Sequence, residues 1–236
     1  MLRELLARGP QRPSSEVKAG FPFKDIYADE VDFISLYRAF IERILREVGP
    51  IFGDSNLIVN VDKTEHGIIG HSDMNVDQAW RDMRKLGSLL GVEEDVNKRI
   101  KLATVSYNKL LALWKHPSLV SVNVRLLSYK AIVESVLLYN CGTWSLSEAL
   151  AEKLDCFQRK MIRRVLNVKW SDKVTNAQLY NRSDTIPISI QVVHARWRLF
   201  GHTLRLDEDT PAKMAITAPD PRMTNGGHNG GEMPPI

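Results

Sequence analysis

Residues 24–34 read KDIYADEVDFI, and this stretch decides the fold class that we expect for the chain. The β-prone side chains of Ile26 and Tyr27 precede two adjacent acids, and a second β-prone run from Val31 to Ile34 follows them. Two such runs on either side of a short polar turn predict a tight antiparallel hairpin. The hairpin would hold its acidic pair at an exposed position, where an ordinary acidic turn is the plainest interpretation.

The segment after the hairpin predicts one helix and then more β structure. Ser35 can cap the helix, apolar residues from Leu36 to Val48 recur every three or four positions, and Gly49 and Pro50 end it. Apolar runs then predict two strands and a short glycine-bracketed element, over residues 57–61, 67–71 and 85–91 respectively.

From about residue 93 the pattern becomes helical. Apolar side chains recur at three- and four-residue spacing in four segments, residues 94–115, 121–140, 147–169 and 187–206. The expected fold is therefore α+β and predominantly α, with a small antiparallel β hairpin or sheet followed by a helical bundle. We expect a poorly ordered N-terminus, a β-containing part, a helical part and a disordered Pro/Gly-rich tail, at residues 1–22, 23–92, 93–206 and 207–236.

The net charge of +4 over 236 residues conceals a segregation of charge along the chain. Residues 1–95 carry 12 basic and 17 acidic side chains, whereas residues 96–206 carry 18 basic and 6 acidic ones. Residues 207–236 are acidic again, with 2 basic and 5 acidic side chains. A middle block with a net charge of +12 favours an anionic partner such as nucleic acid, and a solvated basic surface is the plainer alternative.

Composition narrows the class of protein. With 44% hydrophobic and 25% charged residues, the chain is typical of globular domains rather than of coiled coils or collagen. No apolar run approaches the roughly 18 residues that span a bilayer, and the N-terminus lacks the apolar core of a secretory signal. Two cysteines argue for a reducing compartment. We therefore expect an intracellular protein, nuclear or cytoplasmic, that is neither secreted nor inserted in a membrane.

The third helical segment pairs an apolar face with a basic face. In residues 150–169 the apolar side chains form one stripe, and the opposite side carries Arg159, Lys160, Arg163 and Arg164. Such a face would bind the phosphate backbone of nucleic acid without reading its sequence. The alternative is an exposed face that only solvates the helix.

The fourth helical segment interleaves arginines with aromatic residues. Arg196 and Arg198 flank Trp197, and Phe200 follows within one turn. Arginine and aromatic side chains together could stack on bases. Because large apolar side chains are usually buried, we favour the alternative in which the aromatic residues are core and the arginines lie outside.

Five ordered segments resemble one family of polymerases. The sequence YADEVDFIS at residues 27–35 resembles the Tyr-Ala-Asp-Asp hairpin of reverse transcriptases of non-LTR (LINE-type) retrotransposons. The element that follows this hairpin in the family resembles NLIVNVDKTE at residues 56–65, and the primer grip resembles KLGSLLG at residues 85–91. The family's thumb and post-thumb segment resembles VLLYNCGTWSL at residues 136–146, and its C-terminal Arg-Trp…Gly-His…Leu-Arg run resembles ARWRLFGHTLRL at residues 195–206. The resemblance implies the end of a polymerase palm at residues 23–92, followed by a thumb and post-thumb region at residues 93–206.

The resemblance also implies a site for metal-assisted RNA-directed DNA synthesis. In that family carboxylates hold two metal ions, Mg²⁺ or Mn²⁺, at the growing end of the primer. Asp29 matches the first hairpin aspartate that binds metal, and Glu30 stands where a second aspartate is expected. Glutamate is longer by one methylene, which is a poor fit to a directly coordinating position. Lys63 matches a lysine that could neutralise phosphate charge, although a solvated turn lysine is an equally good interpretation.

The expected partner is RNA or an RNA–DNA duplex, held through its backbone. By the same resemblance, Tyr27 in the hairpin and Lys85 and Gly87 in the primer-grip segment would contact nucleic acid, together with the arginines and the lysine of the two basic helices. The fingers and the first half of the palm, with the third metal-binding aspartate, precede the hairpin in the family, whereas 28 residues precede Asp29 here. We therefore expect that the isolated chain neither polymerises DNA nor requires a cofactor. The alternatives are a non-catalytic nucleic-acid-binding remnant and a functionless helical relic.

Overall fold

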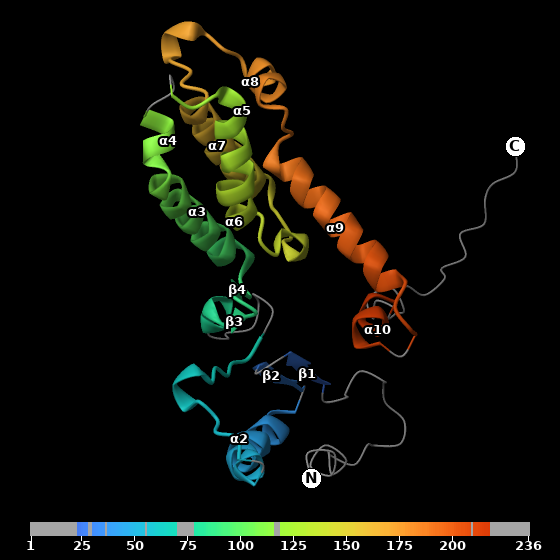
Figure 1. Cartoon of the computed structure of the whole chain (residues 1–236). Coiled ribbons are helices and arrows are strands. Elements are labelled where there is room, and N and C mark those ends of the chain that lie inside the picture. The colour runs from blue at the N-terminus through green and yellow to red at the C-terminus, as the bar shows by residue number, and fades with distance from the viewer. Residues whose placement is uncertain are drawn as a thin grey trace, which may run out of the picture. The chain divides into compact units, whose positions relative to one another are not determined.

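The computed structural model describes residues 23–27, 30–35, 37–54, 56–69, 78–115, 119–208 and 210–217. Their secondary structure is mostly helical, with two short antiparallel hairpins, so the expected α+β, predominantly α, fold class is confirmed (Figure 1). Contacts divide the chain into two compact units, residues 1–101 and 102–236. The segments 1–22 and 218–236, where we expected no order, lie outside the described residues.

The first hairpin forms where the acidic stretch predicts it. Strands β1 (Phe23–Tyr27) and β2 (Glu30–Ile34) pair antiparallel, with Phe23 opposite Ile34 and Tyr27 opposite Glu30. Helix α2 (Arg38–Gly53) follows. Its buried Phe40 and Ile44 form the core of this part of unit 1, and the half-buried neighbours that pack on them are Phe33, Ile41, Val48 and Ile51.

Helix α2 begins later and ends later than predicted. Tyr37, rather than Ser35, occupies the N-cap position, and the Ser35 hydroxyl accepts a hydrogen bond from the Tyr37 N–H at 3.0 Å. Pro50 lies inside the last turn, and the helix ends at Gly53. A proline near a helix end removes one N–H group but leaves the preceding turns intact, so it was a weaker stop than we expected.

The prediction of a strand at residues 57–61 is wrong. Residues 57–60 have no regular structure, and Val61–Lys63 form a single 3₁₀ turn, η1. The Asn60 side chain accepts a hydrogen bond from the Lys63 N–H at 3.2 Å, and the Thr64 hydroxyl donates to the Asn60 carbonyl at 2.9 Å. These local bonds favour a turn over a sheet ladder. At 67–71, where a second strand was predicted, residues 67–69 are irregular and the other two lie outside the described residues.

The glycine-bracketed element forms a second hairpin. After the 3₁₀ helix η2 (Gln78–Asp82), strands β3 (Arg84–Lys85) and β4 (Ser88–Leu89) pair antiparallel across a two-residue turn. Gly87 in this turn has a φ of 79°, in the left-handed region that favours glycine. Helix α3 (Val92–Lys109) follows, and its buried Asp95 accepts a hydrogen bond from the Leu89 N–H at 3.0 Å.

Unit 2 contains the other helices, several of them shorter than predicted. The segment predicted as one helix at 94–115 is interrupted at Leu110, and the one predicted at 121–140 contains a π-helical stretch, η3 (Tyr129–Glu134). The α-helices after α3 are α4 (Leu111–Lys115), α5 (Val122–Ser128), α6 (Ser135–Leu137), α7 (Glu148–Val165), α8 (Asn176–Ser183), α9 (Ile188–Leu204) and α10 (Pro211–Thr217). The 3₁₀ turns η4 (Cys141–Thr143) and η5 (Trp170–Asp172) connect them. Helix α10 lies in the segment predicted to be disordered, and Pro211 at its first position is preset for a helical start.

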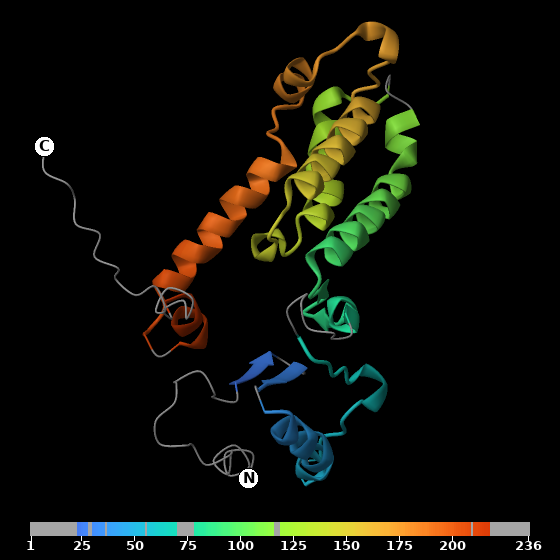
Figure 2. The ribbon, with the colours of Figure 1, turned by 180° about the vertical axis from the view of Figure 1, so that it is seen from behind.

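Helix α7 organises unit 2. It lies beside α5 and α9, as both views of the ribbon show (Figures 1 and 2). Its buried face consists of Leu154, Asp155, Gln158, Met161, Ile162 and Val165. Gly142 in η4 approaches α9 so closely that a Cβ there would lie 3.3 Å from the Ala195 carbonyl oxygen. The two contacts fix α9 between α7 and the turn η4.

The start of α9 is capped by side chains of α7. Pro187 at the N-cap position of α9 offers no side-chain hydrogen bond. Instead, Asp155 accepts hydrogen bonds from the Ser189 N–H at 2.9 Å and the Ser189 hydroxyl at 2.7 Å. Gln158 accepts from the Ile188 N–H and donates to the Ile186 carbonyl, both at 3.1 Å. A buried carboxylate at a helix N-terminus also stabilises the helix dipole.

Candidate nucleic-acid interface

The residues implied as catalytic are described only in part. Asp29 lies outside the described residues, and Tyr27 and Glu30 are placed by their backbone pairing alone. The Lys63 side chain is exposed at the end of η1, and the neighbouring Glu65 accepts a hydrogen bond from the Arg84 N–H at 2.7 Å. Over the described ranges, no three His, Cys, Asp or Glu side chains are grouped so as to hold a metal ion.

The primer-grip-like residues take part in contacts within unit 1. Lys85 forms an ion pair with Asp32 of β2. The Gly87 carbonyl accepts hydrogen bonds from the side chains of Lys98 and Arg99 of α3, each at 3.0 Å. The Arg99 guanidinium also donates to the Ser88 hydroxyl at 3.0 Å. Lys98 and Arg99 therefore hold the second hairpin against α3, and Lys85 links this hairpin to β2.

The basic face predicted on α7 divides into two pairs. Arg159 forms an ion pair with Glu152 at 2.6 Å, and Arg163 donates a hydrogen bond to the Asn176 side chain at 2.8 Å. Burial works to lower the pKa of Arg159, but its hydrogen bond to Glu152 and the nearby Tyr180 hydroxyl outweigh this effect and raise the pKa. Lys160 and Arg164 are exposed. Half of the predicted face is thus used inside the fold, and half is open to solvent.

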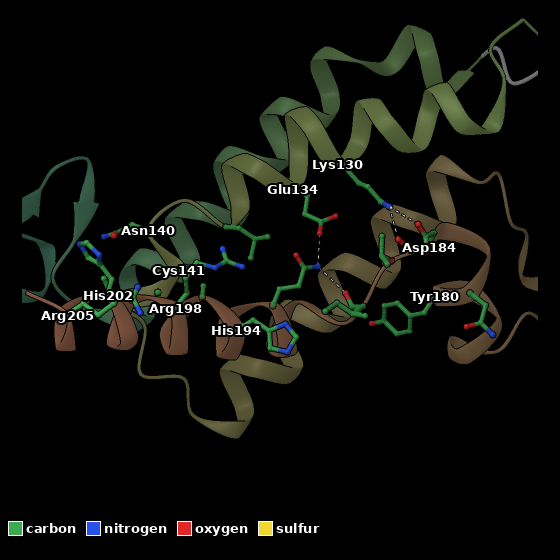
Figure 3. Close-up of a pocket in the computed structure, with 18 residues that line it drawn as sticks. Lys130, Glu134, Asn140, Cys141, Tyr180, Asp184, His194, Arg198, His202 and Arg205 are labelled. Atoms are coloured by element: carbon green, nitrogen blue, oxygen red, sulfur yellow. Dashed lines mark hydrogen bonds and ion pairs between the residues drawn. The ribbon is translucent and has the colours of Figure 1, made fainter.

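The two arginines predicted on α9 point in different directions. Successive residues of an α-helix are rotated by about 100°, so Arg196 and Arg198 lie about 160° apart around the helix. Arg198 lines an open groove with a volume of about 1390 Å³, and Arg196 does not. The groove runs between α9, the π-helical stretch with its following turn, and the end of α8. It is drawn in Figure 3.

A row of basic side chains forms the α9 wall of the groove. The row consists of His194, Arg198, His202 and Arg205, all of them exposed and spaced four, four and three residues apart. This spacing keeps them on one side of the helix over about 16 Å. Figure 3 labels the four side chains along α9. Among the residues that the structure describes, none of the four forms an ion pair with an acid, and α9 itself contains no Asp or Glu.

The acids of the groove are engaged with their neighbours. Asp184 lies 4.0 Å from the Lys130 ammonium, which also donates to the Asp184 carbonyl at 2.7 Å. Glu134 is only 6% exposed, and its carboxylate accepts a hydrogen bond from the Gln191 amide at 2.7 Å. Burial raises the pKa of Glu134, against the opposing effects of Gln191 and Lys130. Glu134 is thus buried, whereas the Asp184 side chain is fully exposed, so Arg198 and Arg205 face one exposed carboxylate among the residues that line the groove.

Stability should depend on pH through Glu134. Because the pKa of Glu134 is raised in the folded state, the Glu134 carboxyl group binds a proton more tightly in the folded protein than in the unfolded chain. The stabilisation is complete below the ordinary pKa of a glutamate and is lost as pH rises through the raised value. We expect Glu134→Gln to gain stability relative to wild type across that rise, measured by urea unfolding from acidic to mildly alkaline pH. Parallel pH curves for the two proteins would contradict the prediction.

The aromatic residues of α9 are not core, contrary to our expectation. Trp197 is 68% exposed and Phe200 39% exposed, and their rings meet edge to face with centroids 5.8 Å apart. The buried positions of α9 are instead Ile188, Val192 and Thr203. The helix is apolar on more than one side, so its composition did not reveal which side packs against α7.

Comparisons with known proteins do not assign the chain to a family. No family model, curated protein or solved structure matches the chain. Within the described residues, no helix is both long enough and apolar enough to cross a bilayer. What can be said of function therefore rests on the residues of the groove and of the exposed helix faces.

Sequence reasoning missed several residues that build this region. Asp155 and Gln158 lie three residues apart on the apolar side of α7, and a polar pair at such positions was a usable sign of buried capping. Arg125, which is 3% exposed, interrupts the apolar face of α5 in the same way. Lys130 and Glu134, one turn apart, carried no comparable signal because either could have been an exposed residue.

Proposed function

We propose that unit 2, the helical unit, binds RNA or an RNA–DNA duplex through the phosphate backbone, using the side chains of α9 that line the groove. The observation that carries the proposal is the row of His194, Arg198, His202 and Arg205 on an acid-free helix. Backbone contacts by Arg and Lys side chains give affinity without sequence readout. The exposed Lys160 and Arg164 of α7 offer a second, smaller basic patch.

We further propose that the chain derives from a non-LTR retrotransposon reverse transcriptase. The five ordered segments of the sequence support this ancestry, and the tight hairpin pairing of Tyr27 with Glu30 is compatible with a polymerase hairpin. Binding is the part of such an activity that the described residues can support, because they include the exposed basic row of α9. Catalysis would require metal ligands that complete Asp29 and Glu30.

Charge reversal in the groove tests the binding proposal. The variant Arg198→Glu/Arg205→Glu should bind a labelled RNA–DNA duplex about tenfold more weakly or worse, and its log–log salt slope should be shallower by about two. The matched control is Lys109→Glu/Lys115→Glu, which makes the same charge change at exposed positions outside the groove. Fluorescence anisotropy over a range of salt concentrations measures both quantities.

The control decides between a site and a bulk effect. If both double variants lose the same affinity and slope, binding follows the net charge and the groove is not the site. A third double variant, Lys160→Glu/Arg164→Glu, reports on the exposed pair of α7. A loss confined to this variant would place the backbone contacts on α7 and overturn the assignment to α9.

A further inference from the structure

A third face of α9 carries large apolar side chains that are open to solvent. They are Ile190, Val193, Trp197, Phe200 and Leu204, which are 39% to 68% exposed. Their spacing of three, four, three and four residues places them in one straight stripe about 21 Å long. A contiguous exposed apolar stripe of this kind is uncommon on a monomer and marks an interaction surface.

The stripe is distinct from the other two faces of the helix. Ile188, Val192 and Thr203 face the core of unit 2, and the row from His194 to Arg205 lines the groove. None of the five stripe residues lines the groove. Within the described residues, packing in unit 2 and the proposed nucleic-acid contact therefore both leave every stripe residue at least 39% exposed.

The spacing of the stripe fits another helix. Alternating steps of three and four residues are the pattern of an a/d seam, in which apolar side chains interlock with those of a partner helix. Three of the five residues are aliphatic and offer no flat face on which a base could stack. A protein helix therefore fits the whole stripe, whereas a single-stranded nucleic acid would use only Trp197 and Phe200.

The charge beside the stripe selects the chemistry of the partner. Arg196 flanks the stripe on the side away from the groove, and α9 has no acidic residue. A second copy of α9 contains no acidic residue that could pair with Arg196, whereas a helix with flanking acids would pair with it beside the apolar seam. We propose that the stripe docks an amphipathic helix of a partner protein whose apolar seam is flanked by acidic residues.

A designed pair of peptides tests this docking with the full chain. Each peptide is a labelled helix about three heptads long with leucine at a and d, carrying glutamate at e and g in the probe and lysine in its control. We expect the glutamate peptide to bind and the lysine peptide to bind about tenfold more weakly or not at all. Binding of the glutamate peptide should also weaken as salt rises.

Variants of the chain locate the contact. Trp197→Ser should weaken binding of the glutamate peptide by about tenfold or more, because a central aromatic anchor is lost. Leu127→Ser is the matched control, since Leu127 of α5 is likewise apolar and 68% exposed. Far-ultraviolet circular dichroism of both variants verifies that their helices are intact.

Four results of the peptide experiments would overturn the proposal. They are failure of the glutamate peptide to bind, equal binding of the two peptides, equal loss in the two serine variants, and displacement of the peptide by single-stranded RNA when that displacement depends on Trp197. Self-association of the chain that Trp197→Ser abolishes would assign the stripe to a second copy instead. The proposal is independent of the groove, because Arg198→Glu/Arg205→Glu leaves all five stripe residues in place.

Discussion

Replacing Asp155 with alanine is expected to lower the free energy of unfolding of the helical unit by about 3 kcal/mol. The carboxylate is 9% exposed and accepts two hydrogen bonds from Ser189, at the first turn of α9. Hydrogen bonds to a charged group contribute about 1.5–3 kcal/mol, and the alanine would leave both Ser189 donors without this acceptor. The favourable interaction of a negative charge with the helix N-terminus would be lost as well.

Two further variants separate capping from general damage to α7. Asp155→Asn keeps one acceptor oxygen and the shape of the side chain, so it should lose about half as much stability. Glu148→Ala changes an exposed acid in the first turn of the same helix and should cost well under 1 kcal/mol. Urea unfolding followed by circular dichroism gives all three values. Similar losses for Asp155→Ala and Glu148→Ala would show that the cap contributes little.

The fold could be predicted from the sequence where local signals agree with one another. The hairpin at β1 and β2 was predictable because two β-prone runs flank turn residues, and α7 was predictable because Ser147 caps a regular apolar stripe. The segment at 57–61 was mispredicted because its apolar run has no partner strand in the described fold, and Asn60 turns the chain instead. The π-helical stretch at Tyr129–Glu134 has no signature that periodicity detects.

The candidate site was only partly predictable, because charge counts do not locate charges. The excess of cations in residues 96–206 was evident, but which of them are exposed depends on partners that are distant in sequence. Arg163 donates a hydrogen bond to Asn176, which is 13 residues away in the sequence, and Arg125 donates one to the Val165 carbonyl, which is 40 residues away. Arg198 belongs to a groove whose opposite wall comes from residues 130–142. Contacts of this range follow from helix packing and not from any local pattern.

Replacing the buried Arg125 with methionine is expected to destabilise the helical unit by about 2 kcal/mol. Arg125 is 3% exposed, and its guanidinium donates a hydrogen bond to the carbonyl of Val165, the last residue of α7. Two effects oppose each other, because burying a guanidinium is costly whereas an unpaired carbonyl at a helix C-terminus is costly too.

For Arg125→Met, we expect the loss of the hydrogen bond to the Val165 carbonyl to outweigh the relief of burying a guanidinium, so that the variant is less stable than wild type. Methionine fills a similar length with apolar atoms but cannot donate to the Val165 carbonyl, and it removes a positive charge from the negative end of the α7 dipole. Arg125→Lys restores the charge and should recover part of the loss. Arg182→Met, at an exposed position in the last turn of α8, is the control and should change stability by less than about 0.5 kcal/mol. If Arg125→Met equals or exceeds wild type in urea unfolding, the desolvation cost of the guanidinium outweighs its cap, and α7 does not depend on Arg125 for its C-terminus.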